Sequence, residues 1–160
     1  MRYFEASLEQ QSFAEIAASL VAVVTAAEPA LRAISEARAD ESRGPGKWSR
    51  KQILGHLVDS AANNHQRFVR AQATPVLRLH GYEQAHWVAS QRYDQIRWDE
   101  VVALWILYNR HLAHVIRHIP EEKRGVLCEI GDNAPVSLAY IACDYVGHIQ
   151  HHLPQILDRK

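Results

Sequence analysis

The chain has 160 residues, a formal net charge of zero at pH 7, and 48% hydrophobic against 22% charged residues. This length and composition are those of one globular domain, which we expect to span residues 1–160 around a full apolar core. Without an excess of positive charge the chain has no electrostatic attraction for a polyanion, so we expect no nucleic-acid partner.

The sequence has no pattern typical of secretion or membrane insertion. The N-terminus, Met1-Arg-Tyr-Phe-Glu, does not resemble a signal peptide, and the longest apolar stretch, residues 16–27, is too short to span a bilayer. Cys128 and Cys143 are too few for a disulfide framework and form no CxxC motif. We therefore expect a soluble, cytoplasmic protein with free thiols and no membrane partner.

The first predicted helix begins at a capping box formed by Ser12 and Glu15. Apolar residues then recur at helical spacing, at Phe13, Ile16, Leu20 and Val24. Pro29 should bend or restart this helix, because proline cannot donate a backbone hydrogen bond. The helical pattern fades around Asp40.

Three further helices are expected after the Gly/Pro-rich break at residues 42–46. The second opens at another capping box, Ser49 with Gln52, and runs to about residue 72. The third covers about 99–119 and ends before Pro120, and the fourth starts near residue 137. No long stretch alternates with a period of two, so the sequence predicts an all-α four-helix bundle.

Two features depart from a simple bundle. The connection over about 75–97 is much longer than the roughly two to eight residues usual between bundle helices, so it should cross the bundle or carry function. Pro154 lies inside the fourth helix and should kink it near His152, since it removes the hydrogen bond to the carbonyl of Gln150.

The fourth helix carries the most informative motif, Tyr145-Val-Gly-His148-Ile-Gln-His151-His152. Residues four apart share a helical face, and both His148 and His152 fall on the apolar stripe, whereas His151 points to its flank. Unpaired polar groups are costly to bury, so the two imidazoles need partners. A shared metal ion would satisfy both; hydrogen bonds to core neighbours are the alternative.

The second helix can supply a third ligand, because His56, Ser60, Asn63 and Arg67 form a polar stripe along the edge of its apolar face. For His56, early in its helix, to meet His148 and His152, late in theirs, the second and fourth helices must be antiparallel. The third helix must then run parallel to the second. This requires a connection about 30 Å long, which the segment over 75–97 can provide.

These residues resemble the DinB/YfiT-like superfamily of bacterial four-helix proteins, described as metal-dependent hydrolases. The resemblance covers nearly the whole chain and is most specific over residues 48–64 and 144–156. The family places one histidine near the start of the second helix and two, four apart, on the last, which map onto His56, His148 and His152. It implies an up-down-down-up bundle with a long connection between helices 2 and 3, and relatives are often dimeric, so we expect a homodimer.

Three neutral imidazoles with an open coordination position suit a divalent metal, zinc or nickel first and iron as a further option. Such a site could activate water for hydrolysis of a small-molecule substrate. It could equally hold a thiolate, and the resemblance implies that some relatives transfer low-molecular-weight thiols. Asp59 and Asp144 are candidates to orient the ligand histidines. Asn63, Arg67 and Tyr145 are candidates to line the substrate pocket.

Two alternatives remain open. His111, His114 and His118 form a second histidine group, but they lie off the apolar face of the third helix, which favours a solvated polar stripe. The chain could also be a non-catalytic dimeric helical protein with a structural metal or none. A site closed by a fourth protein ligand would favour that interpretation.

Overall fold

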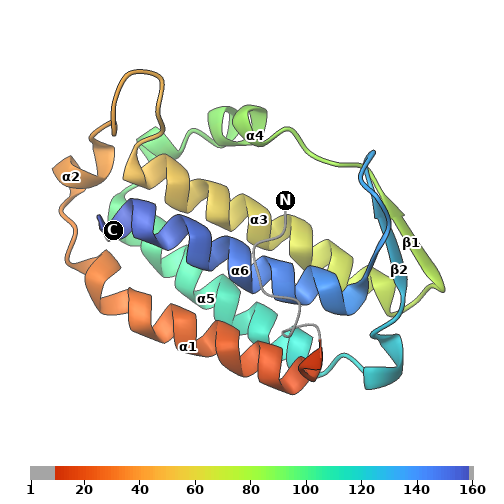
Figure 1. Cartoon of the computed structure of the whole chain (residues 1–160). Helices are drawn as coiled ribbons and strands as arrows, with labels where there is room; N and C mark the ends of the chain where they lie inside the picture. The colour runs from red at the N-terminus through yellow and green to blue at the C-terminus, as the bar shows by residue number, and fades with distance from the viewer. Residues whose placement is uncertain (1–9, 159–160) are drawn as a thin grey trace.

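The computed structural model describes residues 10–158, and its body is a bundle of four long helices (Figure 1). These are α1 (Phe13–Arg32), α3 (Arg50–Ala71), α5 (Trp98–Arg117) and α6 (Leu138–Leu157). In Figure 1, α1 and α6 run in one direction while α3 and α5 run in the other. The order along the chain is therefore up-down-down-up, as the sequence predicted.

The capping residues begin the helices where the sequence placed them. Ser12 and Ser49 both form complete capping boxes, with Glu15 and Gln52, and Ser137 caps α6 by accepting from the backbone of Tyr140. Each cap satisfies a backbone N–H that the first helical turn leaves without a partner.

Pro29 and Pro154 both lie inside continuous helices. α1 continues through Pro29 for three residues, and a short helix, α2 (Glu36–Asp40), restarts after the cap at Ser35. α6 continues through Pro154 to Leu157.

A small sheet closes one end of the bundle, which the all-α expectation did not include. β1 (Val76–Leu79) pairs in parallel with β2 (Leu127–Ile130), and β2 pairs antiparallel with β3 (Val136–Ser137). The long connection thus carries β1, then α4 (Gln84–Gln91) and η2 (Tyr93–Gln95), before α5, and η3 (Glu121–Lys123) precedes β2. In Figure 1 this connection crosses from the end of α3 back to its beginning, as a parallel α3 and α5 require.

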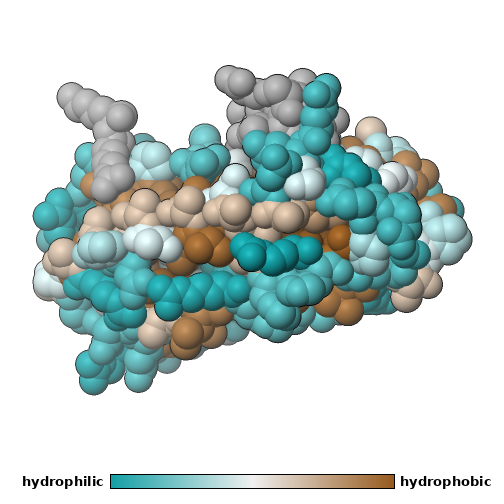
Figure 2. All heavy atoms as spheres, turned by 90° about the horizontal axis from the view of Figure 1, so that it is seen from below, coloured by the Kyte–Doolittle hydropathy of each residue, from teal (hydrophilic) through white to brown (hydrophobic). Residues whose placement is uncertain are grey.

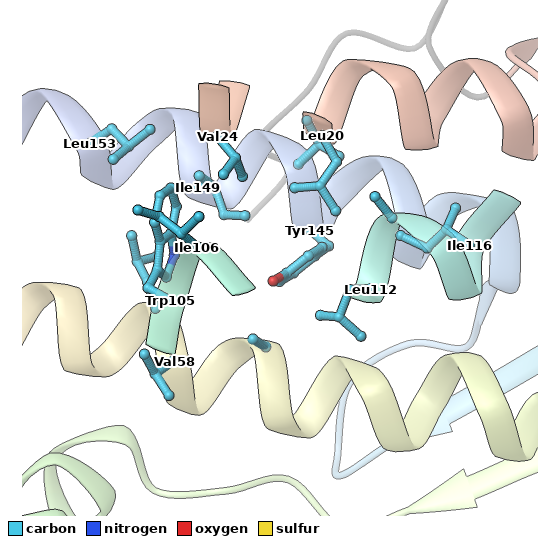
Figure 3. Packing of buried hydrophobic residues seen from close by; sticks show 14 of the residues in the cluster. Leu20, Val24, Val58, Trp105, Ile106, Leu112, Ile116, Tyr145, Ile149 and Leu153 are labelled. Atoms are coloured by element: carbon cyan, nitrogen blue, oxygen red, sulfur yellow. The ribbon is translucent and has the colours of Figure 1, made fainter. Parts of the chain in front are cut away.

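The core lies between the four long helices. Figure 3 shows Leu20 and Val24 of α1 facing side chains of α6, among them Tyr145 and Ile149. From α5, Trp105, Ile106, Leu112 and Ile116 complete this cluster, and all of them are at most 1% exposed. Burying large apolar side chains at a coefficient of about 25 cal/mol per Å² is the main term that holds such a bundle together.

By length and composition alone, α1 is apolar enough to cross a membrane. In the fold it packs against α5 and α6 with a buried stripe that includes Phe13, Ile16 and Leu20. Its outer face bears Glu28, which forms ion pairs with Arg32 and with Arg110 of α5. Figure 2 shows the side of the molecule on which α1 lies, with hydrophilic side chains beside exposed apolar ones. α1 is thus an amphipathic bundle helix.

The first five residues, on which we based the prediction that no signal peptide is present, lie outside the described part of the chain. Cys128 and Cys143 are both buried, and they are not joined by a disulfide.

Candidate metal centre

The histidines predicted as ligands converge at one point between α3 and α6. One ligand atom from each of His56, His148 and His152 can be chosen so that all three lie within 4.8 Å of one another. Nε2 of His56 lies 3.2 Å from Nε2 of His148, and the ring of His152 packs within 5.1 Å of the ring of His56 and 4.6 Å of that of His148. No other His, Cys, Asp or Glu between residues 10 and 158 joins this group.

An ion pair network holds the two helices in this relation. Arg50, the first residue of α3, donates from Nη2 to both carboxylate oxygens of Asp158 at the end of α6, at 2.8 and 2.7 Å. Its Nε donates to the carbonyl of Ile156 at 3.2 Å and its Nη1 to the carbonyl of Arg38 at 3.1 Å. The start of α3 is therefore fixed beside the end of α6, which places His56 opposite His152.

Burial keeps the three imidazoles neutral at pH 7. It lowers the pKa of His56 to about 4 and that of His152 to about 4. Burial, with smaller contributions from the charges of His152 and His56, lowers the pKa of His148 to about 3. Because a histidine binds a metal only as the neutral ring, the fold presents all three in the ligating form.

Polar neighbours orient two of the three rings. Ser60 Oγ lies 3.4 Å from Nδ1 of His148, and Gln155 Nε2 lies 3.3 Å from Nδ1 of His152. Nδ1 of His56 is buried and has no hydrogen-bond partner among residues 10–158, while the indole of Trp48 packs against its ring at 5.4 Å. Nδ1 is the contacted nitrogen of His148 and of His152, and the Nε2 atoms of His56 and His148 face each other.

Asp59, predicted to orient His56, lies in a separate buried group. It is 1% exposed, and its Oδ1 accepts from the hydroxyl of Tyr93 at 2.7 Å and from the amide of Gln91 at 3.1 Å. Its Oδ2 is buried without a partner. Burial raises the pKa of this carboxyl, and both hydrogen bonds oppose the rise. The structure thus leaves two unpartnered buried atoms one turn apart on α3, His56 Nδ1 and Asp59 Oδ2.

A cavity of about 420 Å³ opens beside the histidines, between α3, α6 and the sheet. His148 and Ser60 line it at the histidine end, and Arg67 of α3, Asp144 of α6 and Cys128 of β2 also line it. The cavity therefore connects the candidate metal position with the closed end of the bundle.

Of the three residues predicted to line the substrate pocket, two line this cavity and one does not. Arg67 and Tyr145 both line the cavity, but the hydroxyl of Tyr145 donates to Oδ1 of Asn109 in the core, at 2.5 Å. Asn63 is not among the lining residues, and its amide donates instead to the carbonyl of Asp59. Asn64, one residue further along α3, takes a place in the wall.

Residues that the pattern analysis did not assign also contribute. Ser60 belongs to the polar stripe that includes His56 and could have been recognised from it. Gln155 follows His152 by three residues on the same helix, a spacing that brings side chains together. Tyr93 and Gln91 reach Asp59 from the long connection, and no signal in the sequence indicates that contact.

The second histidine group is solvent-exposed, as predicted. His111, His114 and His118 all lie on the outer side of α5. The ring of His111 packs at 5.2 Å from that of His65 on α3, and His114 and His118 pack on each other at 4.3 Å. In the long connection, the ring of Trp87 packs against that of Tyr82 of the cavity wall at 5.1 Å.

The fold and the site define a four-helix-bundle protein with a candidate centre of three histidines. The profile of the DinB superfamily matches residues 19–156, so the chain belongs to the DinB superfamily. A similar solved structure is that of YfiT from Bacillus subtilis, described as a probable metal-dependent hydrolase with an unusual four-helix bundle topology. The two share 17% sequence identity with a TM-score of 0.82, over 98% of this chain and 87% of YfiT. No curated protein sequence matches the chain.

Proposed function

We propose that this protein is a metal-dependent enzyme that activates water or a small thiol as a nucleophile, with His56, His148 and His152 as the metal ligands. The observation that carries the proposal is the convergence of three neutral imidazoles, one of which, His148, lines a cavity of about 420 Å³. A buried polar cluster that opens into a cavity is the usual form of an active site.

The donor set and its spacing fit a divalent metal. Two nitrogens bound at 2.0–2.1 Å to one tetrahedral zinc ion lie about 3.3 Å apart, and the Nε2 atoms of His56 and His148 are 3.2 Å apart. Imidazole ligands suit zinc, nickel and iron alike, so the ligand set agrees with our expectation of a divalent metal without choosing among the three. When bound, the metal would supply a Lewis acid at the end of the cavity.

The protein's own side chains prepare the site for this role. Ser60 can accept the Nδ1–H of His148, which leaves the Nε2 lone pair directed at the shared point. Gln155 Nε2 lies 3.3 Å from Nδ1 of His152 and restrains the position of that ring. With three protein ligands among residues 10–158, a small molecule in the cavity has coordination positions left to occupy.

We further propose that Asp59 and Asp144 orient ligand histidines. Asp59 Oδ2 and His56 Nδ1 are the unpartnered pair on α3, and a carboxylate acceptor would fix the tautomer of His56. Asp144 lies one turn before His148 and lines the same cavity.

Loss of a partner that orients a ligand histidine costs about 10–100-fold in metal affinity, so Asp59→Asn and Asp144→Asn should each weaken zinc binding by this factor in a competition titration. Affinities within twofold of wild type would refute the role.

The first experiment is elemental analysis of the purified protein, comparing wild type with His152→Ala and with His111→Ala. We expect near-stoichiometric metal in wild type and in His111→Ala, whose histidine is exposed on α5, and loss of metal in His152→Ala. Hydrolysis of model esters and amides, and transfer of small thiols to electrophiles, would then be screened on the metal-loaded protein to separate the two reactions.

Absence of metal, even after reconstitution with zinc, nickel and iron, would contradict the proposal. The remaining candidate would be the non-catalytic helical protein that acts through association. Metal present with no accessible coordination position, shown by failure to bind a small chelating inhibitor such as acetohydroxamate, would favour a structural metal.

A further inference from the structure

Arg67 places a partly buried positive charge in the cavity wall. Its side chain makes one hydrogen bond, from Nη1 to Oδ1 of Asn64 at 3.2 Å, and no ion pair with any residue between 10 and 158. A guanidinium carries five N–H donors, so most of them have no protein acceptor here. Burial lowers the pKa of Arg67, which reflects the removal of its charge from water.

The rest of the wall favours a ligand with a single negative charge. Asp144 lines the same cavity. The wall therefore carries one acidic and one basic side chain, and the negative charge of Asp144 offsets the positive charge of Arg67. The remaining polar neighbours, such as Ser60, Asn64 and Asn133, are neutral. A dianionic group such as a phosphate would be repelled by Asp144, whereas a monocarboxylate matches the planar fork of one arginine.

The spacing along α3 fixes where such a group would sit. Ser60 contacts His148 at the histidine end, and Arg67 follows seven residues later on the same side of the helix. At 1.5 Å per residue these positions are about 10 Å apart along the helix axis. A ligand that fills the cavity therefore meets His148 at one end and Arg67 at the other.

From this geometry we infer that the cavity binds an elongated monocarboxylate, whose carboxylate is held by Arg67 while its other end lies at His148, the member of the three-histidine cluster that lines the cavity. The inference rests on the proposed function in one respect: the end of the ligand opposite the carboxylate is taken to react at the proposed metal. It adds a substrate class, a carboxylic acid whose reactive group and carboxylate lie at opposite ends of the molecule.

The test uses zinc-loaded full-length protein and a series of ω-carboxy alkyl hydroxamates of increasing chain length, with their methyl esters as neutral partners. The hydroxamate binds the metal and the carboxylate probes Arg67. Dissociation constants are measured by calorimetry for wild type, Arg67→Met, Arg67→Lys and Arg70→Met. Arg70 is the control, because it lies on the same helix but is exposed to solvent.

We expect the acid of optimal length to bind wild type and Arg70→Met at least about tenfold more tightly than its ester. Arg67→Met should lose this preference while its affinity for the ester stays unchanged, which shows that the cavity is intact. Arg67→Lys should keep part of the preference, since it retains the charge but not the fork.

The outcomes separate the two proposals. The carboxylate assignment would be overturned, with the metal site left in place, if the acids bound wild type no more tightly than their esters. It would also be overturned if the higher affinity of the acids persisted in Arg67→Met. Phosphonate analogues that bind more tightly than the carboxylates would also overturn it, in favour of a dianion. Failure of zinc to load would instead contradict the proposed function, and simple alkyl carboxylates would then test Arg67 alone on the apoprotein.

Discussion

Gly55 shows how one residue without a side chain positions the candidate centre. A Cβ at this position would lie 2.2 Å from Cδ2 of Tyr93, whose ring lies against α3 and whose hydroxyl reaches Asp59. Gly55 also precedes His56 in the chain. Glycine in a helix interior lowers stability by about 0.5–1 kcal/mol relative to alanine. At Gly55 this cost is offset by the close packing of the Tyr93 ring against the helix.

We predict that Gly55→Ala destabilises the protein by about 1–3 kcal/mol, because the ring of Tyr93 must move away from the new methyl group. The matched control is Gly125→Ala, where an added Cβ meets nothing within 4 Å. Urea denaturation of both variants measures the difference. In a Tyr93→Ala background the sign should reverse, because the clash is gone and only the helical preference for alanine remains. An equal loss in both backgrounds would show that Tyr93 is not the cause.

Cys128 lines the proposed substrate cavity, and its titration gives a second prediction. Burial raises the pKa of its thiol to about 11, and only the thiolate reacts with alkylating agents. About one molecule in a thousand is therefore ionised at pH 8. In a Cys143→Ser background, iodoacetamide should modify the native protein very slowly at pH 8, with a rate that rises about tenfold per pH unit up to pH 10. Modification at the rate of the urea-unfolded control would contradict this.

At the residue scale, the convergence of the three histidines was predictable because position on a helical face is a local property. His148 and His152 share the apolar stripe of one helix, and His56 borders that of another. The contacts of Asp59 with Tyr93 and Gln91 were not predicted, since they join residues more than 30 positions apart. Contacts of this kind depend on the path of a loop and leave no periodic signal.

At the scale of the elements, Arg50 joins three segments of the chain at the histidine end of the bundle. Its side chain is 10% exposed and donates to two backbone carbonyls as well as to Asp158, which is 41% exposed. Removing a buried donor leaves those carbonyls without a partner, whereas removing an exposed carboxylate leaves its partners in contact with water.

We predict that Arg50→Met lowers the free energy of unfolding by about 1–3 kcal/mol and that Asp158→Asn lowers it by less than about 1 kcal/mol. Asparagine is the suitable replacement because residue 158 has a φ of 52°, a left-handed conformation that it tolerates. Guanidinium denaturation measures both. Losses of equal size would mean that the ion pair, rather than the bonds to the carbonyls, is the main contribution of Arg50.

The helices could be read from the sequence, but the sheet could not. The capping boxes at Ser12 and Ser49 and the apolar periodicity are local signals, and α3 begins and ends within a residue or two of its predicted bounds. The strands have only two to four residues, too few for alternation to be visible. β1 and β2 also pair across a separation of 51 residues, so their partnership is a consequence of the bundle rather than a cause of it.

At the scale of the whole molecule, the long connection decides which residues meet. Because it carries the chain from the end of α3 back to its beginning, α5 runs parallel to α3 and α6 runs antiparallel to it. The early part of α3 then faces the late part of α6, and the three histidines converge there. The length of this connection was visible in the sequence, which is why the topology could be predicted while the strand and helix within it could not.

A metal held by His56, His148 and His152 would cross-link α3 and α6, so its binding should stabilise the whole bundle. At a free concentration of one hundred times the dissociation constant, a ligand that binds only the folded state adds about 2.7 kcal/mol. For a chain of this size each kcal/mol raises Tm by about 2–4 °C. We therefore predict that zinc raises the Tm of the metal-free protein by about 5–10 °C in a calorimetric scan and that EDTA reverses the rise. The rise should be absent from His148→Ala and unchanged in His118→Ala, whose ring is exposed on α5. A rise retained in His148→Ala would place the metal elsewhere.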